Sequence, residues 1–178
     1  MNQQNPKSDK QQMHLFIQLS SLLTGFSVRQ LEKTGLKSVY LEHVAGKRKS
    51  AFDSLLENFE ELLEKYKTNS VDQMKVEERQ ELGDALLHPS QPEATIQVAL
   101  GIIEMWYLGS SYFEDRNKER EEEKVKVISS SAYTKGLAWR AMQSHAMGAS
   151  RKHYGHWSQP PEDLSAFTGR SLNRGGEQ

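Results

Sequence analysis

Cysteine is absent from the 178 residues, and so is any long apolar run. Without thiols the chain forms no disulfide framework, thiolate zinc site or iron–sulfur cluster, and it has no cysteine nucleophile. No run approaches the roughly 20 apolar residues that a membrane-spanning helix needs, so we expect no such helix. Lysine and arginine number 23 against 24 acidic residues, for a formal net charge of -1. This balance argues against a nucleic-acid binder that acts through a broad basic field.

The start of the chain also lacks an apolar signal core. Residues 1–6 are polar, so we expect neither a secretory nor a twin-arginine signal, and the chain by itself favours a cytoplasmic location. Composition divides the chain into three parts. We expect a disordered polar tail over residues 1–11, a helical bundle over residues 12–150, and an extended partner-binding arm with a flexible tail over residues 151–178.

Hydrophobic residues recur at helical spacing, and no alternating pattern is long enough to predict a sheet. The sequence therefore predicts an all-α fold, a single irregular bundle of about six helices. Gly25 and Ser27 are suited to end the first helix and cap the second, and Ser50 to cap the third. The helix over residues 93–108 is apolar nearly all round and is the expected central helix. The other helices are expected over about residues 13–24, 28–45, 50–66 and 71–87, and from Ser129-Ser130-Ser131 through Met142.

Catalytic and metal-binding patterns are scarce. No glycine-rich phosphate loop is present, and no two of the six histidines have the helical spacing of a metal site. His153 and His156 lie three residues apart in an irregular segment. A weak metal site is one interpretation of this spacing, but surface or interface histidines are the favoured one. The serines at 129–131 are better explained as helix caps than as nucleophiles, because no Gly-x-Ser-x-Gly elbow surrounds them. We therefore expect no enzyme activity, cofactor or metal in this chain.

The tryptophans and tyrosines carry more information. Core packing is the favoured interpretation for Trp106 and Trp139. Trp157 lies outside any expected helix, between Gly155 and two prolines, and a tryptophan in such a segment is often an anchor on a partner surface. The candidate partner interface consists of Trp106, Tyr107, Tyr154, Trp157, Pro160 and Pro161.

Five short segments follow one another in an order that is hard to obtain by chance, although none is specific alone. They are Leu15 to Phe26, which ends in Leu23-Thr24-Gly25-Phe26; Tyr40-Leu41; Trp106-Tyr107-Leu108-Gly109; Ser131-Ala132-Tyr133 with Gly136-Leu137-Ala138-Trp139; and Tyr154-Gly155-His156-Trp157-Ser158-Gln159-Pro160-Pro161. In this order they resemble the small (gamma) subunit of membrane-bound, FAD-dependent sorbitol and fructose dehydrogenases.

The resemblance implies a non-catalytic role. In that family the small subunit binds and stabilises a large subunit of the glucose–methanol–choline oxidoreductase type, which holds the FAD and oxidises a sugar or polyol. A cytochrome c subunit often completes the complex. The family's small subunits frequently carry a twin-arginine signal, and the resemblance therefore implies a periplasmic, membrane-associated location, which the polar start of this chain does not predict. Two alternatives stay open: a helical adaptor unrelated to oxidoreductases, and a free-standing helical enzyme.

Overall fold

The structure, a computed structural model, describes residues 9–111 and 126–146, and within them the predicted all-α fold is confirmed. The helices of this part are α1 (Asp9–Thr24), α2 (Val28–Glu32), α3 (Lys37–Lys65), the 3-10 helix η1 (Val71–Gln73), α4 (Val76–Leu86), α5 (Glu93–Leu108), α6 (Ser130–Thr134) and α7 (Leu137–Ala141). Two strands, β1 (Ser110–Ser111) and β2 (Lys126–Val127), complete it. The predicted arm over residues 151–178 lies outside the described residues. Helix α1 begins at Asp9, so residues 9–11 of the predicted tail are helical.

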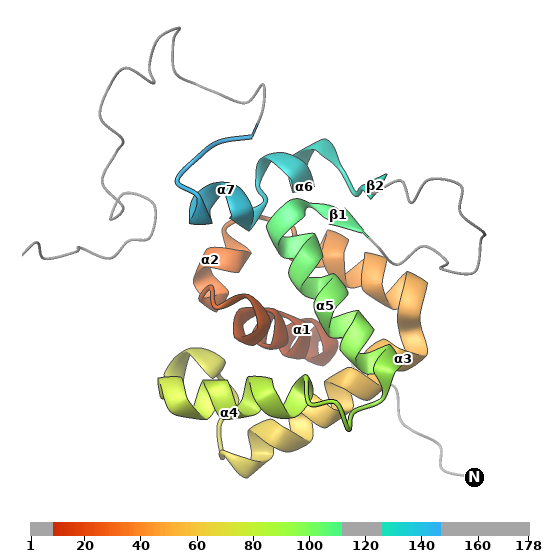
Figure 1. Ribbon diagram of the computed structural model, residues 1–178, viewed down its shortest axis with the longest axis vertical. Coiled ribbons are helices and arrows are strands. Elements are labelled where there is room, and N and C mark those ends of the chain that lie inside the picture. The colour runs from red at the N-terminus through yellow and green to blue at the C-terminus, as the bar shows by residue number, and fades with distance from the viewer. Residues whose placement is uncertain (1–8, 112–125, 147–178) are drawn as a thin grey trace, which may run out of the picture.

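Three helices form the centre of the bundle, because α1, α3 and α5 all pack against one another. Helix α4 lies against α3 and α1, and η1 and α2 lie against α1. The short helices α6 and α7 pack on α5 at the end where β1 follows it (Figure 1). This end of the bundle carries the candidate site.

The second half of helix α1 is buried more completely than α5. Residues 15–21 are buried without interruption, although three of them are polar. The Gln18 side-chain oxygen accepts the backbone N–H of Val71 at 2.8 Å, which satisfies both buried groups. Helix α5 has the predicted bounds, but it leaves Leu100 and Leu108 more than two-fifths exposed. Helix α5 is therefore central in the number of helices that it contacts, as predicted, but it is not buried on all sides.

Helix α3 joins two segments that the sequence separated. The expected boundary near residues 45–50 coincides with a break in helical geometry at Arg48 (φ −140°, ψ 39°), where the two helical segments of α3 meet at a kink. Tyr40, Val44 and Phe52 lie at multiples of four residues and are all buried, so the core-facing side continues across the kink. Ser50 is exposed inside the helix and begins no helix of its own.

The turns on either side of α2 follow the sequence in part. Gly25 adopts φ +75° after α1, and Ser27 forms a reciprocal capping box with Gln30, so both predictions are confirmed. Gly35, with φ +71°, belongs to a complete break rather than a mild interruption, and α2 already ends at Glu32. The segment expected to be one helix over residues 28–45 is therefore two.

The last described part is more divided than predicted. Strands β1 and β2 pair antiparallel over two residues each, where the sequence predicted no sheet. Ser129 caps α6 as expected, since its hydroxyl accepts the Ala132 N–H at 3.0 Å. The predicted final helix is split between α6 and α7 at Gly136, and the helix predicted over residues 71–87 is split into η1 and α4. Among the described helices none combines the length and apolar character required to cross a membrane.

Candidate functional site

Six aromatic side chains gather where α5 ends and α6 and α7 pack on it, and we call this region the aromatic end. Its rings come from both halves of the chain and meet edge to face, the arrangement that aromatic pairs favour. The three pairs are Tyr40–Trp106, Phe26–Tyr107 and Tyr133–Trp139, with ring centroids 4.8, 6.1 and 5.5 Å apart.

Tyr107 connects α5 to the turn after α1. Its hydroxyl donates a hydrogen bond of 2.9 Å to the carbonyl oxygen of Thr24, across 83 residues of sequence. Its ring packs against Phe26 in the same turn. Because Gly25 reverses the chain between these two residues, both can face Tyr107. The first and third of the five segments picked out in the sequence therefore meet here.

Two glycines let the third and fourth segments approach each other backbone to backbone. A Cβ on Gly109 would lie 2.6 Å from the Tyr133 nitrogen and closer still to the carbonyl group of Ala132. A Cβ on Gly136 would lie 2.6 Å from the carbonyl oxygen of Tyr107. Gly109 also has φ +69°, a conformation that other residues rarely adopt. Each of the two segments thus has a glycine at the point where the backbone of the other segment is in contact with it.

Side-chain hydrogen bonds hold α6 and α7 in place. The indole N–H of Trp139 donates to the carbonyl oxygen of Tyr133 at 2.7 Å. Lys135 reaches from the α6–α7 turn to donate a hydrogen bond of 2.8 Å to the carbonyl oxygen of Thr34, just before α3. Four of the five segments, including Tyr40 in the second, therefore lie together at the aromatic end.

The candidate interface residues fall into three groups. Trp106 is 1% exposed and packs on Tyr40, so the core interpretation is confirmed and its assignment to the partner interface is corrected: the side chain has no surface to offer. Tyr107 is half-buried and keeps some exposed surface, as does Trp139. The remaining candidates lie outside the described residues, as do His153 and His156. They are Tyr154, Trp157, Pro160 and Pro161.

One close polar pair was missed by the sequence reasoning. The Nε2 atom of His43 lies 2.6 Å from the hydroxyl of Ser111, and 68 residues separate them. A serine beside a histidine is the arrangement of an activated nucleophile. Ser111 is only 4% exposed, so a substrate could not reach its hydroxyl in this structure. No local pattern around either residue signals the contact.

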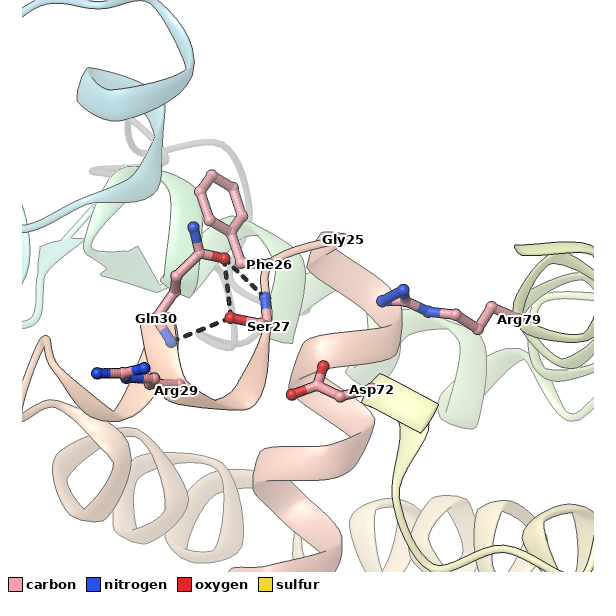
Figure 2. Close-up of a pocket in the computed structure, with 7 residues that line it drawn as sticks. All are labelled: Gly25, Phe26, Ser27, Arg29, Gln30, Asp72 and Arg79. Carbon is pink, nitrogen blue, oxygen red and sulfur yellow. Dashed lines mark hydrogen bonds between the residues drawn. The ribbon is translucent and has the colours of Figure 1, made fainter. Parts of the chain in front are cut away.

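A surface pocket of about 500 Å³ lies beside the aromatic end, at the turn between α1 and α2 (Figure 2). Acceptor atoms around it already take part in hydrogen bonds: the Asp72 carboxylate accepts from the Ser21 hydroxyl at 3.2 Å and from the Val28 N–H at 3.1 Å. The side-chain oxygen of Gln30 accepts the Ser27 N–H at 2.9 Å. The lining residues are Gly25, Phe26, Ser27, Arg29, Gln30, Asp72 and Arg79.

Polar side chains of this pocket are engaged in contacts that hold the turn. Its one side-chain hydroxyl, on Ser27, is bonded to Gln30 in the capping box. Within residues 9–111 and 126–146, no three histidine, aspartate or glutamate side chains are grouped to hold a metal ion. The candidate functional site is therefore a surface, the aromatic end with its adjoining pocket.

Three polar atoms in the aromatic end are buried without a hydrogen-bond partner among the described residues: the Tyr40 hydroxyl, the Trp106 indole nitrogen and the Ser110 hydroxyl. Burial also raises the pKa of Tyr40 above its ordinary value of 10.0. The neutral phenol is thus favoured by folding. Its contribution to stability is fully present below pH 10 and decreases as the pH rises further, because only the unfolded chain ionises readily.

We therefore expect Tyr40→Phe to be no less stable than the wild type at pH 7, and up to about 1 kcal/mol more stable, because it removes an unsatisfied hydroxyl. Above pH 10 its advantage should grow by at most about 1.4 kcal/mol per pH unit. Urea denaturation at both pH values measures this. Tyr107→Phe is the matched control and should lose about 1 kcal/mol at pH 7, since it gives up a hydrogen bond that is made. Equal losses of stability in the two variants would contradict the conclusion that the Tyr40 hydroxyl has no hydrogen-bond partner.

Comparison with protein-family models, with curated proteins and with solved structures found no match to this chain.

Proposed function

We propose that this chain is a non-catalytic small subunit that binds and stabilises a large FAD-dependent dehydrogenase of the glucose–methanol–choline type. The large subunit holds the FAD and oxidises a sugar or polyol, and the small chain carries no cofactor of its own. The observation that supports the proposal best is the meeting, at the aromatic end, of segments that resemble the small subunits of this family. The residues of these segments that meet there include Phe26, Tyr40, Tyr107 and Trp139.

This meeting supports the proposal because short chance resemblances have no reason to share a place in the fold. Tyr107 is in contact with a residue 83 positions away, and Lys135 with one 101 positions away. The fifth segment, around Trp157, follows α7 along the chain, and α7 packs on α5 at this same end. In the proposal, Tyr107 and the segment with Tyr154, Trp157, Pro160 and Pro161 face the large subunit.

Co-purification tests the proposal directly. The chain, tagged and expressed in its own host, should bring with it a large yellow protein that contains FAD in stoichiometric amount. Purified alone, the chain should be colourless and should reduce no dye with sugars or polyols. A colourless partner would favour the helical adaptor instead, and FAD bound to the isolated chain would contradict a non-catalytic subunit.

Trp157→Ala refines the same experiment. Loss of a well-buried interface tryptophan weakens binding by about 2–4 kcal/mol, roughly thirty- to thousandfold. The helical circular dichroism of the isolated variant should stay unchanged. Trp139→Ala serves as the control, because it breaks a hydrogen bond to Tyr133 within the bundle and should lower the melting temperature of the isolated chain. A Trp157→Ala variant that melts several degrees lower by itself would instead assign this side chain to the fold.

A further inference from the structure

Charge is distributed unevenly between the two ends of the bundle. Residues 53–84, which include the second half of α3 and all of α4, contain ten acidic and four basic side chains. Two of these fourteen, Asp72 and Arg79, line the pocket beside the aromatic end, and the other twelve are nine acidic and three basic. We call this region the acidic pole. Residues 126–146, which carry α6 and α7, contain three basic side chains and no acidic one. Helix α2 and the start of α3, residues 28–44, add three basic and two acidic side chains to the same end.

Several cations at the aromatic end have no ionic partner among the described residues. Lys37 pairs with Glu32 at 2.6 Å, and Lys135 is bonded to a backbone carbonyl. Arg29, Lys33 and Arg140 form no salt bridge within the part of the chain that the structure describes. Because the Lys135 bond joins the α6–α7 turn to the α2–α3 turn, these cations lie on neighbouring elements; Figure 1 shows α2 and α7 on the same side of the bundle.

Exposed apolar side chains gather at the same end. Six large hydrophobic residues are at least two-fifths exposed in the described part of the chain. Two of them, Val76 and Leu100, lie elsewhere, on α4 and in the middle of α5. The other four belong to elements of the aromatic end, and they are Val39, Leu108, Val127 and Met142. Apolar side chains with a charged border are the usual composition of a surface that binds another protein.

We propose that the aromatic end is the docking surface of this chain and that its occupant is an acidic surface of a partner protein. The proposal rests on the proposed function, in which the partner is the large flavoprotein, and it states which face docks and what charge the partner presents. Partner carboxylates would pair with Arg29, Lys33 and Arg140, and apolar partner groups would cover Leu108 and Met142. The acidic pole repels the same partner surface, so the field of the whole chain orients the encounter.

The test is charge reversal on the co-purified complex with the flavoprotein. The triple variant Arg29→Glu, Lys33→Glu, Arg140→Glu should weaken the complex about tenfold or more at low salt, because three opposed pairs become repulsive. The control reverses three exposed carboxylates of the acidic pole, as Glu61→Lys, Glu64→Lys and Asp84→Lys, and should change affinity less than about twofold at moderate salt, since these charges lie away from the interface. Raising the salt should weaken the wild-type complex more than the complex of the cation variant.

Each outcome decides a separate point. If both triple variants bind the flavoprotein as tightly as the wild type, the docking surface is overturned and the proposed function stands. If no flavoprotein co-purifies with the wild type, the proposed function fails, and immobilised poly-L-glutamate then tests the surface alone. If the wild type and the control variant are retained on poly-L-glutamate and the cation variant is not, the result supports docking of another acidic protein. If the wild type is not retained, the docking surface is overturned.

Three other occupants give distinct results. Duplex DNA or phosphatidylserine vesicles that bind the wild type where poly-L-glutamate does not would overturn the proposal in favour of a nucleic acid or a membrane. The chain's own acid-rich stretch, residues 112–125, joins β1 to β2 at this end and is the third candidate. If that stretch occupied the surface, the isolated cation variant would melt well below the wild type, and this result would also overturn the proposal.

Discussion

Gly109→Ala is expected to be strongly destabilising, because it adds a methyl group where two backbone segments touch. The new Cβ would collide with the backbone of Ala132 and Tyr133, which cannot move aside as the end of a flexible side chain can. Overpacking of this kind lowers the free energy of unfolding by about 1–3 kcal/mol, and the positive φ adds roughly 1–2 kcal/mol. Gly136→Ala should incur only the overpacking cost, because its new Cβ would collide with the carbonyl oxygen of Tyr107. Urea denaturation of the isolated chain measures both.

The chain supplies matched controls for this pair. Gly46 and Gly83 lie inside α3 and α4, and an added methyl group at either position would have no neighbouring atom within 4 Å. Gly→Ala there should therefore raise stability by about 0.5–1 kcal/mol through helix propensity. Gly25 has a positive φ and open space, so Gly25→Ala isolates the conformational term. If Gly109→Ala lost no more stability than Gly25→Ala, the close approach of the two segments would be refuted.

Trp106→Ala is expected to lower the free energy of unfolding by about 3–5 kcal/mol, since the side chain is 1% exposed and packs on Tyr40. Trp106→Phe should lose less, because it keeps an aromatic ring and removes an indole N–H that has no partner among the described residues. Thermal unfolding followed by circular dichroism measures both losses.

The same variants distinguish core from interface. Any Trp106→Phe protein that folds should bind the partner with wild-type affinity, because this side chain has no exposed surface to lose. If the Trp106→Phe protein had wild-type stability but did not bind the partner, Trp106 would belong to the interface, as the sequence alone predicted.

The sequence predicted helices best where the chain marks both ends. Helix α5 has the predicted bounds, because Pro92 precedes it and Gly109 takes a left-handed conformation after it. The interior of α3 was predicted in part, because the expected boundary is a kink at Arg48 rather than a separation of two helices. Gly46 and Ser50 are local signals of a helix end, whereas the burial of Phe52 in register with Val44 continues the same core-facing side. The local signals mark the kink at Arg48, and core packing keeps the two segments of α3 on the same side of the core.

The candidate site was only partly accessible from sequence. Helical spacing indicates that Trp106 faces the core, but no spacing rule brings Tyr107 to Thr24 or Lys135 to Thr34. The central position of α1 was hidden because Gln18 is polar, and its burial depends on the N–H of Val71, 53 residues away. These contacts come from the tertiary arrangement, which a pattern read along the chain does not contain.

The long separations in the aromatic end have a consequence for folding. The contact between α3 and α4 closes a loop of moderate length, whereas the Lys135–Thr34 hydrogen bond joins positions 101 residues apart. Contacts of large sequence separation carry a greater loop-closure entropy and tend to form late. We expect the aromatic end to assemble after the rest of the bundle, and its backbone amides to exchange with solvent sooner than those of α1. A partner that holds this end closed would therefore act on the least persistent part of the fold.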